Sequence, residues 1–337
     1  MKDIAKMAGV SPSTVSAAIN NSSRISPKTR ERVLKIVREL NYSPNAFAKG
    51  LRGKAMNTIG LILPSIDNPF YPAIARGVED VAKANGYNVF LCNSDRDQNK
   101  EMEYIDSLIQ KQVDGYIFAA PIVEETGILQ ITATGRPAVV VNKEINGDLI
   151  DEVWIDYVCG SYDLVKYLIK LGHRRIVHIQ GPPGLKRSGD RLAGYLQAMK
   201  EHGLLVDNGL IRHGDFNYQS GYTQTLALFE EKGPKPTAIF AANDLMALGV
   251  VAAIQDLGFK VPDDISVAGF DDIALASYVR PKLTTVYQPN YEVGKMAMEI
   301  LSARISQKKD VGKIRITMET SLVIRNSTAA PPRGRQP

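Results

Sequence analysis

The segment from Asp3 to Asn20 reads DIAKMAGVSPSTVSAAIN, and it predicts two short helices joined by a tight turn. Gly9 ends the first helix, because glycine readily adopts the left-handed conformation that follows a helix. Ser11 and Pro12 begin the second helix, since serine is a good N-cap and proline suits the first helical position. The apolar side chains recur at helical spacing. Those expected to face inward are Ile4, Ala5, Met7, Ala8, Val15, Ala18 and Ile19.

The same start signal recurs at Ser26 and Pro27, where it predicts a third helix. Apolar positions follow at helical spacing, with basic side chains on the other face. The inward set is Val33, Ile36, Val37 and Leu40, and the outward set is Lys28, Arg30, Arg32, Lys35 and Arg38. Three helices with a glycine turn after the first are typical of a helix-turn-helix, whose second helix enters the major groove of DNA. The plainer alternative is a capped three-helix bundle without a partner.

Positive charge gathers in the first sixth of the chain, residues 1–56, which we call the head. The head holds 11 basic and 3 acidic residues, whereas the other 281 residues hold 30 and 33. The chain's net charge of +5 therefore comes from the head, and a basic head favours a polyanionic partner. The predicted second helix adds short hydroxyl and amide side chains, which bond phosphates and base edges. Together these features favour DNA binding over a plain bundle.

Residues 42–52 read YSPNAFAKGLR and predict a further short helix that begins at Ser43 and Pro44. A helix of this length is marginal in water, and an interior Gly50 costs about 1 kcal/mol. We therefore expect it to need a partner in order to fold. Leu51 lies between two cationic side chains, which fits an apolar wedge between base steps of the minor groove. It equally fits a flexible linker whose leucine packs on the next domain.

Residues 57–330 alternate apolar strand-like runs with helical segments, which predicts parallel sheets covered by helices. The expected strands are 59–63, 87–92, 115–119, 138–141, 176–179, 238–241 and 265–269. The expected helices are 73–85, 101–111, 162–171, 192–202, 222–231 and 245–257. Seven strands over this length indicate two α/β lobes. Because ligands of such sheets bind at the carboxyl ends of the strands, the polar loops 64–68 and 180–182 are candidate ligand contacts.

The sequence lacks the signatures of several function classes. Its 337 residues include two cysteines, Cys92 and Cys159, too few for a disulfide framework or a four-thiolate zinc site. No apolar run approaches the ~18 residues of a membrane span, and residues 1–6 do not resemble a signal peptide, so we expect a cytoplasmic protein with no membrane partner. Neither the dinucleotide-binding G-x-G-x-x-G nor a P-loop is present. We expect no catalysis, no cofactor and no metal site.

In its ordered set of motifs the chain resembles the LacI/GalR family of transcription regulators. The likeness begins with the segment quoted first and with residues 42–52. It continues through Thr58-Ile59-Gly60, Asn68-Pro69-Phe70-Tyr71, Gly172-His173-Arg174-Arg175-Ile176, Arg191-Leu192-Ala193-Gly194-Tyr195, Asn243-Asp244, Gly269-Phe270-Asp271-Asp272 and Leu283-Thr284-Thr285-Val286. Each motif is weak alone, but the set spans residues 1–327 and is specific.

The resemblance implies an all-α helix-turn-helix DNA-binding domain, a hinge and an α/β body of two doubly wound parallel-sheet lobes, periplasmic-binding-protein-like and of type I. The expected bounds are 1–42 for the DNA-binding domain, 43–56 for the hinge helix or linker and 57–330 for the effector-binding and dimerisation domain. Within the body, lobe 1 would hold 57–157 and 290–316, and lobe 2 would hold 158–289 and 317–330. The chain would cross between the lobes near residues 157, 289 and 317, and residues 331–337 would form a disordered tail.

On the DNA side, the resemblance implies a homodimer that places two heads in successive major grooves of a near-palindromic operator. The hinge would fold on DNA, with Leu51 opening a central step. The implied DNA-contacting residues are Pro12, Ser13, Ser16, Ala17, Asn20, Arg24, Ser26, Asn45, Lys49 and Leu51. Two of them depart from the family pattern. Ala17 stands where many members carry arginine or another long polar residue, and Pro12 has no base-reading donor, so a bidentate guanine contact is missing there.

On the effector side, the resemblance implies a small molecule bound between the lobes, whose closure reaches the heads. The implied ligand-binding residues are Phe70, Tyr71, Asn142, Arg191, Phe216, Asn243, Asp271 and Gln288. An arginine fork, an aspartate and an asparagine around an aromatic face suit a sugar or a related polyol.

We therefore expect an effector-controlled transcriptional regulator, a repressor in the first instance. Two alternatives stay open: a solute-binding protein of the same body fold without a regulatory role, and a sugar- or nucleotide-processing enzyme on a doubly wound fold. A solute-binding protein would carry a signal peptide and no head, and the sequence shows the opposite of both. A protein corepressor, which some relatives use, also stays open. A dimer is favoured over a tetramer, since no leucine heptads follow residue 325.

Overall fold

The computed structural model describes residues 1–19, 22, 24–40, 42, 56–145, 150–306 and 312–332. The chain divides into two compact units, Met1–Met56 and Asn57–Pro337. The first unit is the head, and we call the second the body.

The described residues of the head form three helices: α1 (Lys2–Met7), α2 (Pro12–Ile19) and α3 (Pro27–Glu39). The Ser11 Oγ accepts a hydrogen bond from the Thr14 amide at 3.2 Å, and the Ser26 Oγ accepts one from the Thr29 amide at 3.2 Å. Both predicted N-caps are therefore present at the starts of α2 and α3. The core they enclose is small and consists of Ile4, Ala5, Ala8, Val15, Ala18 and Val33.

Two residues expected in this core lie outside it. Met7 is 58% exposed and Leu40 is 45% exposed. α1 has six residues, and its buried face consists of Ile4 and Ala5. Met7 lies next to this face and so remains exposed. Leu40 follows the last residue of α3, past the end of a core too small to cover it.

In the body, one group of elements forms lobe 1 around a six-stranded sheet of order β11-β5-β4-β3-β1-β2, in which every paired strand runs parallel to its neighbour. Its strands are β1 (Thr58–Leu63), β2 (Asn88–Asn93), β3 (Gly115–Ala119), β4 (Ala138–Val141), β5 (Asp151–Ile155) and β11 (Arg315–Met318). Its helices are α5 (Phe70–Ala84), α6 (Gln98–Gln110), α7 (Glu125–Thr132) and α13 (Asn290–Ser306). Alternate strand residues face different helix layers: Leu61 packs with α5 and α13, and Ile62 packs with α6 and α7.

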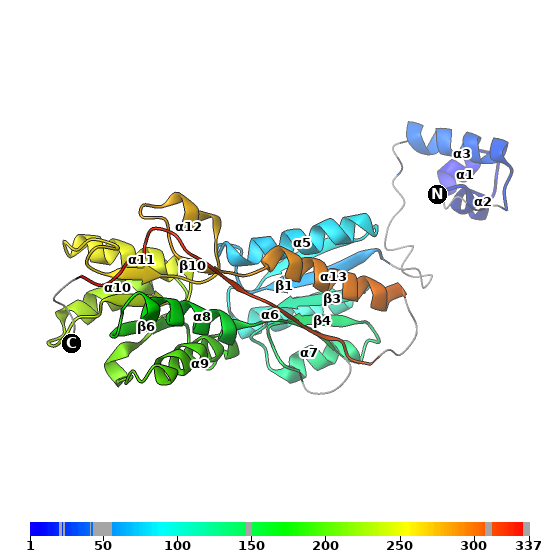
Figure 1. Ribbon diagram of the computed structural model, residues 1–337. Helices are drawn as coiled ribbons and strands as arrows, with labels where there is room; N and C mark the ends of the chain where they lie inside the picture. The colour runs from blue at the N-terminus through cyan, green and yellow to red at the C-terminus, as the bar shows by residue number, and fades with distance from the viewer. Residues whose placement is uncertain are drawn as a thin grey trace. The chain divides into compact units, whose positions relative to one another are not determined.

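Lobe 2 is built in the same way around a four-stranded parallel sheet of order β7-β6-β8-β9. Its strands are β6 (Ile176–Gln180), β7 (Ile211–His213), β8 (Ala238–Ala241) and β9 (Ser266–Ala268). Its helices are α8 (Tyr157–Lys170), α9 (Lys186–Glu201), α10 (Tyr218–Glu230), α11 (Asp244–Asp256) and α12 (Ala274–Tyr278), with a short 3₁₀ turn at Asn208–Leu210. Figure 1 shows the two lobes side by side, joined by strands that run between them.

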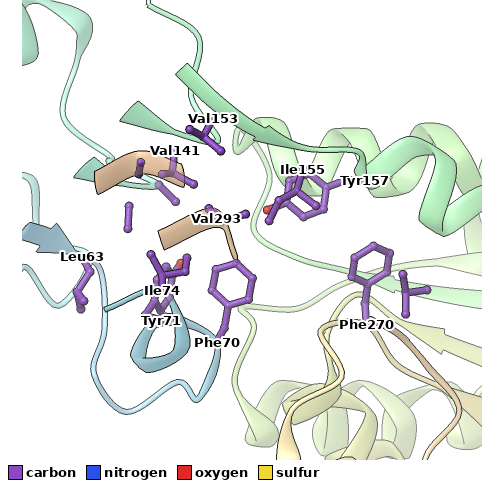
Figure 2. Close-up of a cluster of buried hydrophobic side chains, with 14 of the residues drawn as sticks. Leu63, Phe70, Tyr71, Ile74, Val141, Val153, Ile155, Tyr157, Phe270 and Val293 are labelled. Atoms are coloured by element: carbon purple, nitrogen blue, oxygen red, sulfur yellow. The ribbon is translucent and has the colours of Figure 1, made fainter. Parts of the chain in front are cut away.

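The chain passes between the lobes three times. It leaves lobe 1 after β5 and enters α8; it returns between β10 (Thr285–Tyr287) and α13; and it crosses again between β11 and β12 (Ser321–Val323). β10 and β12 pair with each other in antiparallel register. One apolar cluster extends through this junction, and Figure 2 shows Ile155 beside Tyr157, with Phe270 farther into lobe 2.

Close helix packing in lobe 2 depends on glycine. A Cβ at Gly221 of α10 would lie 2.1 Å from the Met246 carbonyl oxygen of α11, and one at Gly249 would lie 2.1 Å from the Tyr218 carbonyl oxygen. The two helices therefore meet backbone to backbone, which only glycine permits at both positions.

The predicted fold class, an all-α head followed by parallel α/β lobes, is confirmed. All seven predicted strands are present, but the six predicted helices begin one to six residues earlier than expected. α9, for example, begins at Lys186 rather than at residue 192. The first turns of α6 and α9 consist of polar residues. A search for apolar residues at helical spacing therefore does not detect them. Among the described residues, no helix has both the length and the apolar composition needed to cross a membrane.

Candidate functional site

The exposed face of α2 is a cluster of small hydroxyl side chains. The Ser11 Oγ lies 2.7 Å from the Ser13 Oγ and 2.9 Å from the Thr14 Oγ1. Pro12 and Ser13 are exposed at the first turn, while Ser16 and Ala17 are half-buried on the next. Short side chains here let the helix backbone approach another surface closely.

The other predicted DNA contacts fall into two groups. Arg24 is exposed in the turn after α2, and Ser26 is exposed where it caps α3. Asn20, Asn45, Lys49 and Leu51 lie outside the described residues, as does the predicted hinge apart from Met56. The DNA-contacting roles of all these residues stay predictions.

Between the lobes of the body lies a small cavity of about 20 Å³. Its lining comes from loops at the carboxyl ends of strands, from the first turn of α5 and from the first two turns of α9, where ligands of parallel sheets bind. Lobe 1 contributes Asn68, Phe70, Tyr71 and Arg96; lobe 2 contributes Arg187, Arg191, Phe216, Asn243 and Asp271. A cavity of this volume has room for about one water molecule, so a larger ligand requires the lobes to move apart or the side chains to rearrange.

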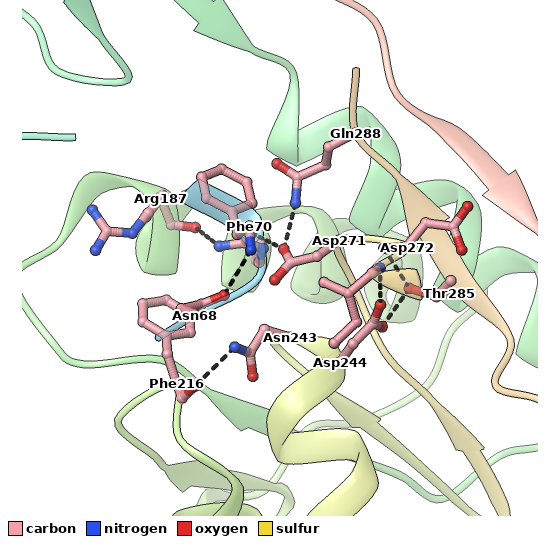
Figure 3. Close-up of polar contacts among 12 residues, drawn as sticks. Asn68, Phe70, Arg187, Phe216, Asn243, Asp244, Asp271, Asp272, Thr285 and Gln288 are labelled. Atoms are coloured by element: carbon pink, nitrogen blue, oxygen red, sulfur yellow. Dashed lines mark hydrogen bonds and ion pairs between the residues drawn. The ribbon is translucent and has the colours of Figure 1, made fainter. Parts of the chain in front are cut away.

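Asp271 is the acidic centre of the cavity. Its Oδ1 accepts a hydrogen bond from the Gln288 Nε2 and forms an ion pair with the Arg191 Nη2 at 3.3 Å; Figure 3 shows the Gln288 amide directed at this carboxylate. Burial raises the pKa of Asp271, and the charge of Arg191 opposes that rise. The Arg191 guanidinium lies 4.4 Å from the ring centroids of both Tyr157 and Phe270. This packing fixes the plane in which Arg191 offers its donors.

Phe216 supplies an aromatic face at the same cavity. Its ring packs on Gly181, where a Cβ would fall 2.1 Å from the Phe216 Cζ. The Asn243 Nδ2 donates a hydrogen bond to the Phe216 carbonyl oxygen at 2.9 Å (Figure 3). The Asn243 Oδ1 also caps α11 by accepting from the Met246 amide at 3.0 Å. Asn243 therefore holds the Phe216 loop against the start of α11.

Six of the eight predicted ligand-binding residues line the cavity: Phe70, Tyr71, Arg191, Phe216, Asn243 and Asp271. Gln288 reaches it through Asp271. Asn142 is buried after β4, outside this lining, where its Oδ1 accepts from the Ile155 amide at 3.0 Å. The structure thus brings seven of these residues together, and their roles in binding stay predictions.

Sequence reasoning did not select three residues that line the cavity. Asn68 belongs to the polar loop after the first predicted strand, so that loop carried the signal. Arg187 precedes Arg191 by one helical turn, a spacing that puts both on one face of a helix. Arg96 follows β2 in a loop, and nothing in its local sequence marks it.

The chain matches two sequence families. Residues 1–45 match "Bacterial regulatory proteins, lacI family", and residues 165–328 match "Periplasmic binding protein-like domain". Over 327 residues the chain is 38% identical to catabolite control protein A of Priestia megaterium, covering 97% of this chain and 98% of the relative.

Two solved structures are similar over nearly the full length. The lac repressor dimer bound to operator and the anti-inducer ONPF has a TM-score of 0.86 at 30% identity, with 97% of this chain and 98% of that chain covered. The complex of the transcriptional regulator CelR with cellobiose has a TM-score of 0.75 at 30% identity, with 96% and 98% covered.

Proposed function

Because this chain belongs to the LacI family of bacterial transcriptional regulators, we propose that it represses transcription as a homodimer bound to a near-palindromic operator, under the control of a small molecule held between the lobes. The observation that carries this proposal is that a basic helix-turn-helix head and a polar two-lobe cleft occur in one chain. A solute-binding protein without a regulatory role would have no use for the head. The relatives named above are regulators rather than enzymes, as expected from the sequence.

The head supports the DNA half of the proposal. The exposed hydroxyls at the start of α2 suit phosphate and base-edge contacts, and the basic side chains of α3 add attraction to the backbone. The described residues of the head form one ion pair, between Lys35 and Glu39 at 4.0 Å, so most of the positive charge is available to a polyanion. The lac repressor in the structure compared above is bound to its operator.

A groove in lobe 1 supports the dimer. β2 ends the strand order of its sheet, and between β2 and α5 lies a groove of about 520 Å³, lined in part by Ile66 and Leu91. Ile66 is 51% exposed and Leu91 is 48% exposed. Apolar side chains grouped in this way mark a protein interface, and the lac repressor compared above is a dimer. We propose that a second copy covers the groove.

The cleft supports a hydroxylated effector. Asp271, Asn243 and Asn68 offer acceptors and donors beside the Phe216 ring, an arrangement that suits a sugar's hydroxyls and apolar ring face. CelR was solved with cellobiose. In the proposed mechanism, the effector binds the open and closed clefts with different affinity and so shifts the dimer towards or away from the DNA-binding state.

The test is a selection of bound duplexes from a random pool of about 24 base pairs, with the full-length protein at two salt concentrations. Enrichment of a palindrome with half-sites about one helical turn apart is the expected result. A protein that enriches no sequence at either salt concentration would contradict direct operator binding, and added cell extract would then show whether a corepressor is required. The enriched duplex serves as the operator in all the measurements below.

A further inference from the structure

The cavity between the lobes carries more positive than negative charge. Among its described lining residues three are arginines, Arg96, Arg187 and Arg191, and one is an acid, Asp271. Asp271 is already engaged by Arg191 and by the Gln288 amide. The one carboxylate therefore cannot neutralise the three guanidinium groups.

The two remaining arginines have no carboxylate of their own. No described acidic side chain lies within 4.0 Å of the guanidinium nitrogens of Arg96 or Arg187, as the ion pairs of the described residues show. The Asp215 side chain is not part of the cavity lining. Burial opposes its ionisation, but hydrogen bonds from Ser220 and Asn217, with a smaller contribution from the charge of Arg96, lower its pKa. Its carboxylate is already bonded to the Asn217 amide and side chain. Arg96 instead donates to the Asp215 main-chain oxygen.

Buried guanidinium donors also lack hydrogen-bond partners. The Arg187 Nη2, Arg191 Nε and Arg96 Nε are buried without a partner among the described residues. Arg187 as a whole is 8% exposed and Arg191 is 2% exposed. A buried charged donor that makes no hydrogen bond is costly, so these groups favour a ligand that brings acceptors and negative charge.

The three arginines converge on one aromatic ring from both lobes. The distances to the Phe216 centroid are 6.0 Å from Arg96, 5.3 Å from Arg187 and 5.6 Å from Arg191. Arg96 belongs to lobe 1 and the other two to lobe 2, so their mutual repulsion opposes closure of the cleft. An anion placed among them turns that repulsion into attraction and stabilises the closed form.

We propose that the effector is anionic: a carboxylate or phosphate group on a hydroxylated carbon skeleton, with the anionic group held by Arg187 and Arg96. Planar guanidinium forks bind both groups in a bidentate manner. The Arg191–Asp271 pair and Asn243 then serve the hydroxyl groups. This inference rests on the proposed function and specifies the chemical class of its effector.

The experiment compares matched ligands on the full-length protein. Glucose, glucose 6-phosphate and gluconate form one set, galactose and galacturonate a second, and inorganic phosphate is added alone. Thermal stability and operator affinity are measured for wild type, for Arg187→Gln and Arg96→Gln, and for the control Arg212→Gln, whose ion pair with Glu231 lies outside the cavity. Glucose 6-phosphate carries a phosphate, whereas gluconate and galacturonate carry a carboxylate. Comparing them shows which of the two anionic groups the cavity prefers.

We expect at least one anion to raise the Tm of wild type and of the control, and to change operator affinity, while its neutral counterpart does neither. Arg187→Gln should weaken that anion's binding about ten- to a hundredfold, and Arg96→Gln should weaken it as well. The inference is overturned if a neutral sugar acts as strongly as its anionic counterpart, or if no anion shifts the Tm of wild type more than that of Arg187→Gln. Operator binding by ligand-free wild type is measured first. A failure of the proposed DNA-binding function is therefore distinguished from a failure of the inference about the effector.

Discussion

The Arg96 guanidinium of lobe 1 donates a hydrogen bond to the Asp215 main-chain oxygen of lobe 2, with 2.9 Å between the Arg96 Nη1 and the oxygen. The two residues are 119 positions apart, and their contact bridges the lobes at the edge of the cavity. Arg96 thus contacts lobe 2 directly through this hydrogen bond, in addition to facing Phe216.

Replacing Arg96 with methionine should weaken effector binding. The variant keeps much of the side chain's length but loses the hydrogen bond that joins the lobes and the positive charge that attracts an anionic effector, so an effector that binds the closed form should bind about tenfold more weakly. Trp154, the only tryptophan in the sequence, lies in β5 next to the first crossing, and its fluorescence provides the titration signal. Arg212→Met is the matched control, and equal affinities in the two variants would refute the role of Arg96.

Asp271→Asn should destabilise lobe 2 by about 3–5 kcal/mol, because it leaves the buried charge of Arg191 without its partner. The double variant Asp271→Asn with Arg191→Met should recover part of that loss, since it removes the unpaired charge. Urea denaturation of wild type, Asp271→Asn, Arg191→Met and the double variant gives the coupling free energy between the two side chains. A coupling near zero would show that the 3.3 Å ion pair contributes nothing in solution.

Gly221→Ala should destabilise the protein by about 3 kcal/mol or more, because the new Cβ meets the rigid main chain of α11 rather than a movable side chain. Gly189→Ala is the control: Gly189 lies within α9, and a Cβ there would meet no atom within 4 Å. Alanine in an exposed helix interior is about 1 kcal/mol better than glycine, so the control should be slightly more stable than wild type. Thermal denaturation shows whether each substitution lowers or raises the Tm. A Gly221→Ala variant with a raised Tm would contradict the close packing of α10 and α11.

The stability of lobe 2 should fall in acid because of two buried histidines. Burial lowers the pKa of His173 to about 4 and that of His178 to about 3, whereas an unfolded histidine titrates near 6.5. The unfolded state therefore binds more protons below pH 6.5, and each histidine's contribution is present above that pH and is lost as the pH falls towards the folded pKa. Between pH 7 and pH 5 the loss is about 2 kcal/mol for each histidine.

The measurement is the change in unfolding free energy from pH 7 to pH 5 in wild type and in His173→Gln. The variant should lose about 2 kcal/mol less than wild type. Comparing the two cancels the opposite trend from Asp244, whose pKa is raised by burial. His202→Gln, at the exposed end of α9, should follow wild type; a His173→Gln profile identical to wild type would refute the assignment.

Introducing arginine at Ala17 should add a base preference at one position of each half-site. Ala17 is half-buried on α2, one helical turn after the exposed Ser13, and an arginine that reaches a guanine contributes about 1–3 kcal/mol of discrimination. Leu40→Arg adds the same charge at the end of α3 and should raise affinity for all sequences alike. Repeating the duplex selection with both variants checks this. An unchanged preference in Ala17→Arg would mean that α2 does not read the bases there.

The sequence predicted the scaffold better than it predicted the cleft. Six of the seven expected strands are buried along their whole length and so are continuous apolar runs. The seventh, β2, is a largely exposed edge strand, but its apolar run could also be recognised from local composition. The start of α9 could not, because its first turn is polar, and that turn carries Arg187 towards the cavity. The place of Arg96 in the cavity depends on tertiary structure alone. It faces Phe216, which is 120 residues away in the chain, and no pattern in the local sequence predicts such a contact.

His173 shows the same limit from the other side. A histidine directly after Gly172 is typical of a helix cap, but the two ring nitrogens of His173 lie 2.9 Å from the Thr237 Oγ1 and 2.9 Å from the Ala329 carbonyl oxygen. It joins the end of α8 to β8 and to the segment that follows β12. A histidine that follows a glycine can cap a helix at the surface or be buried against distant residues. The local sequence is the same in both cases, so it cannot distinguish them.

The three crossings have a consequence for synthesis on the ribosome. Lobe 1 needs α13 and β11 to complete its sheet and helix layer, and lobe 2 needs the segment after β12, where the Ser327 carbonyl oxygen accepts from the Val267 amide at 2.8 Å. Neither lobe is therefore a continuous stretch of chain that can finish folding while the rest is being translated. The nascent body must therefore remain incomplete, with apolar surface exposed, until about residue 328 has left the exit tunnel. In contrast, α1, α2 and α3 of the head can pack together as soon as they emerge.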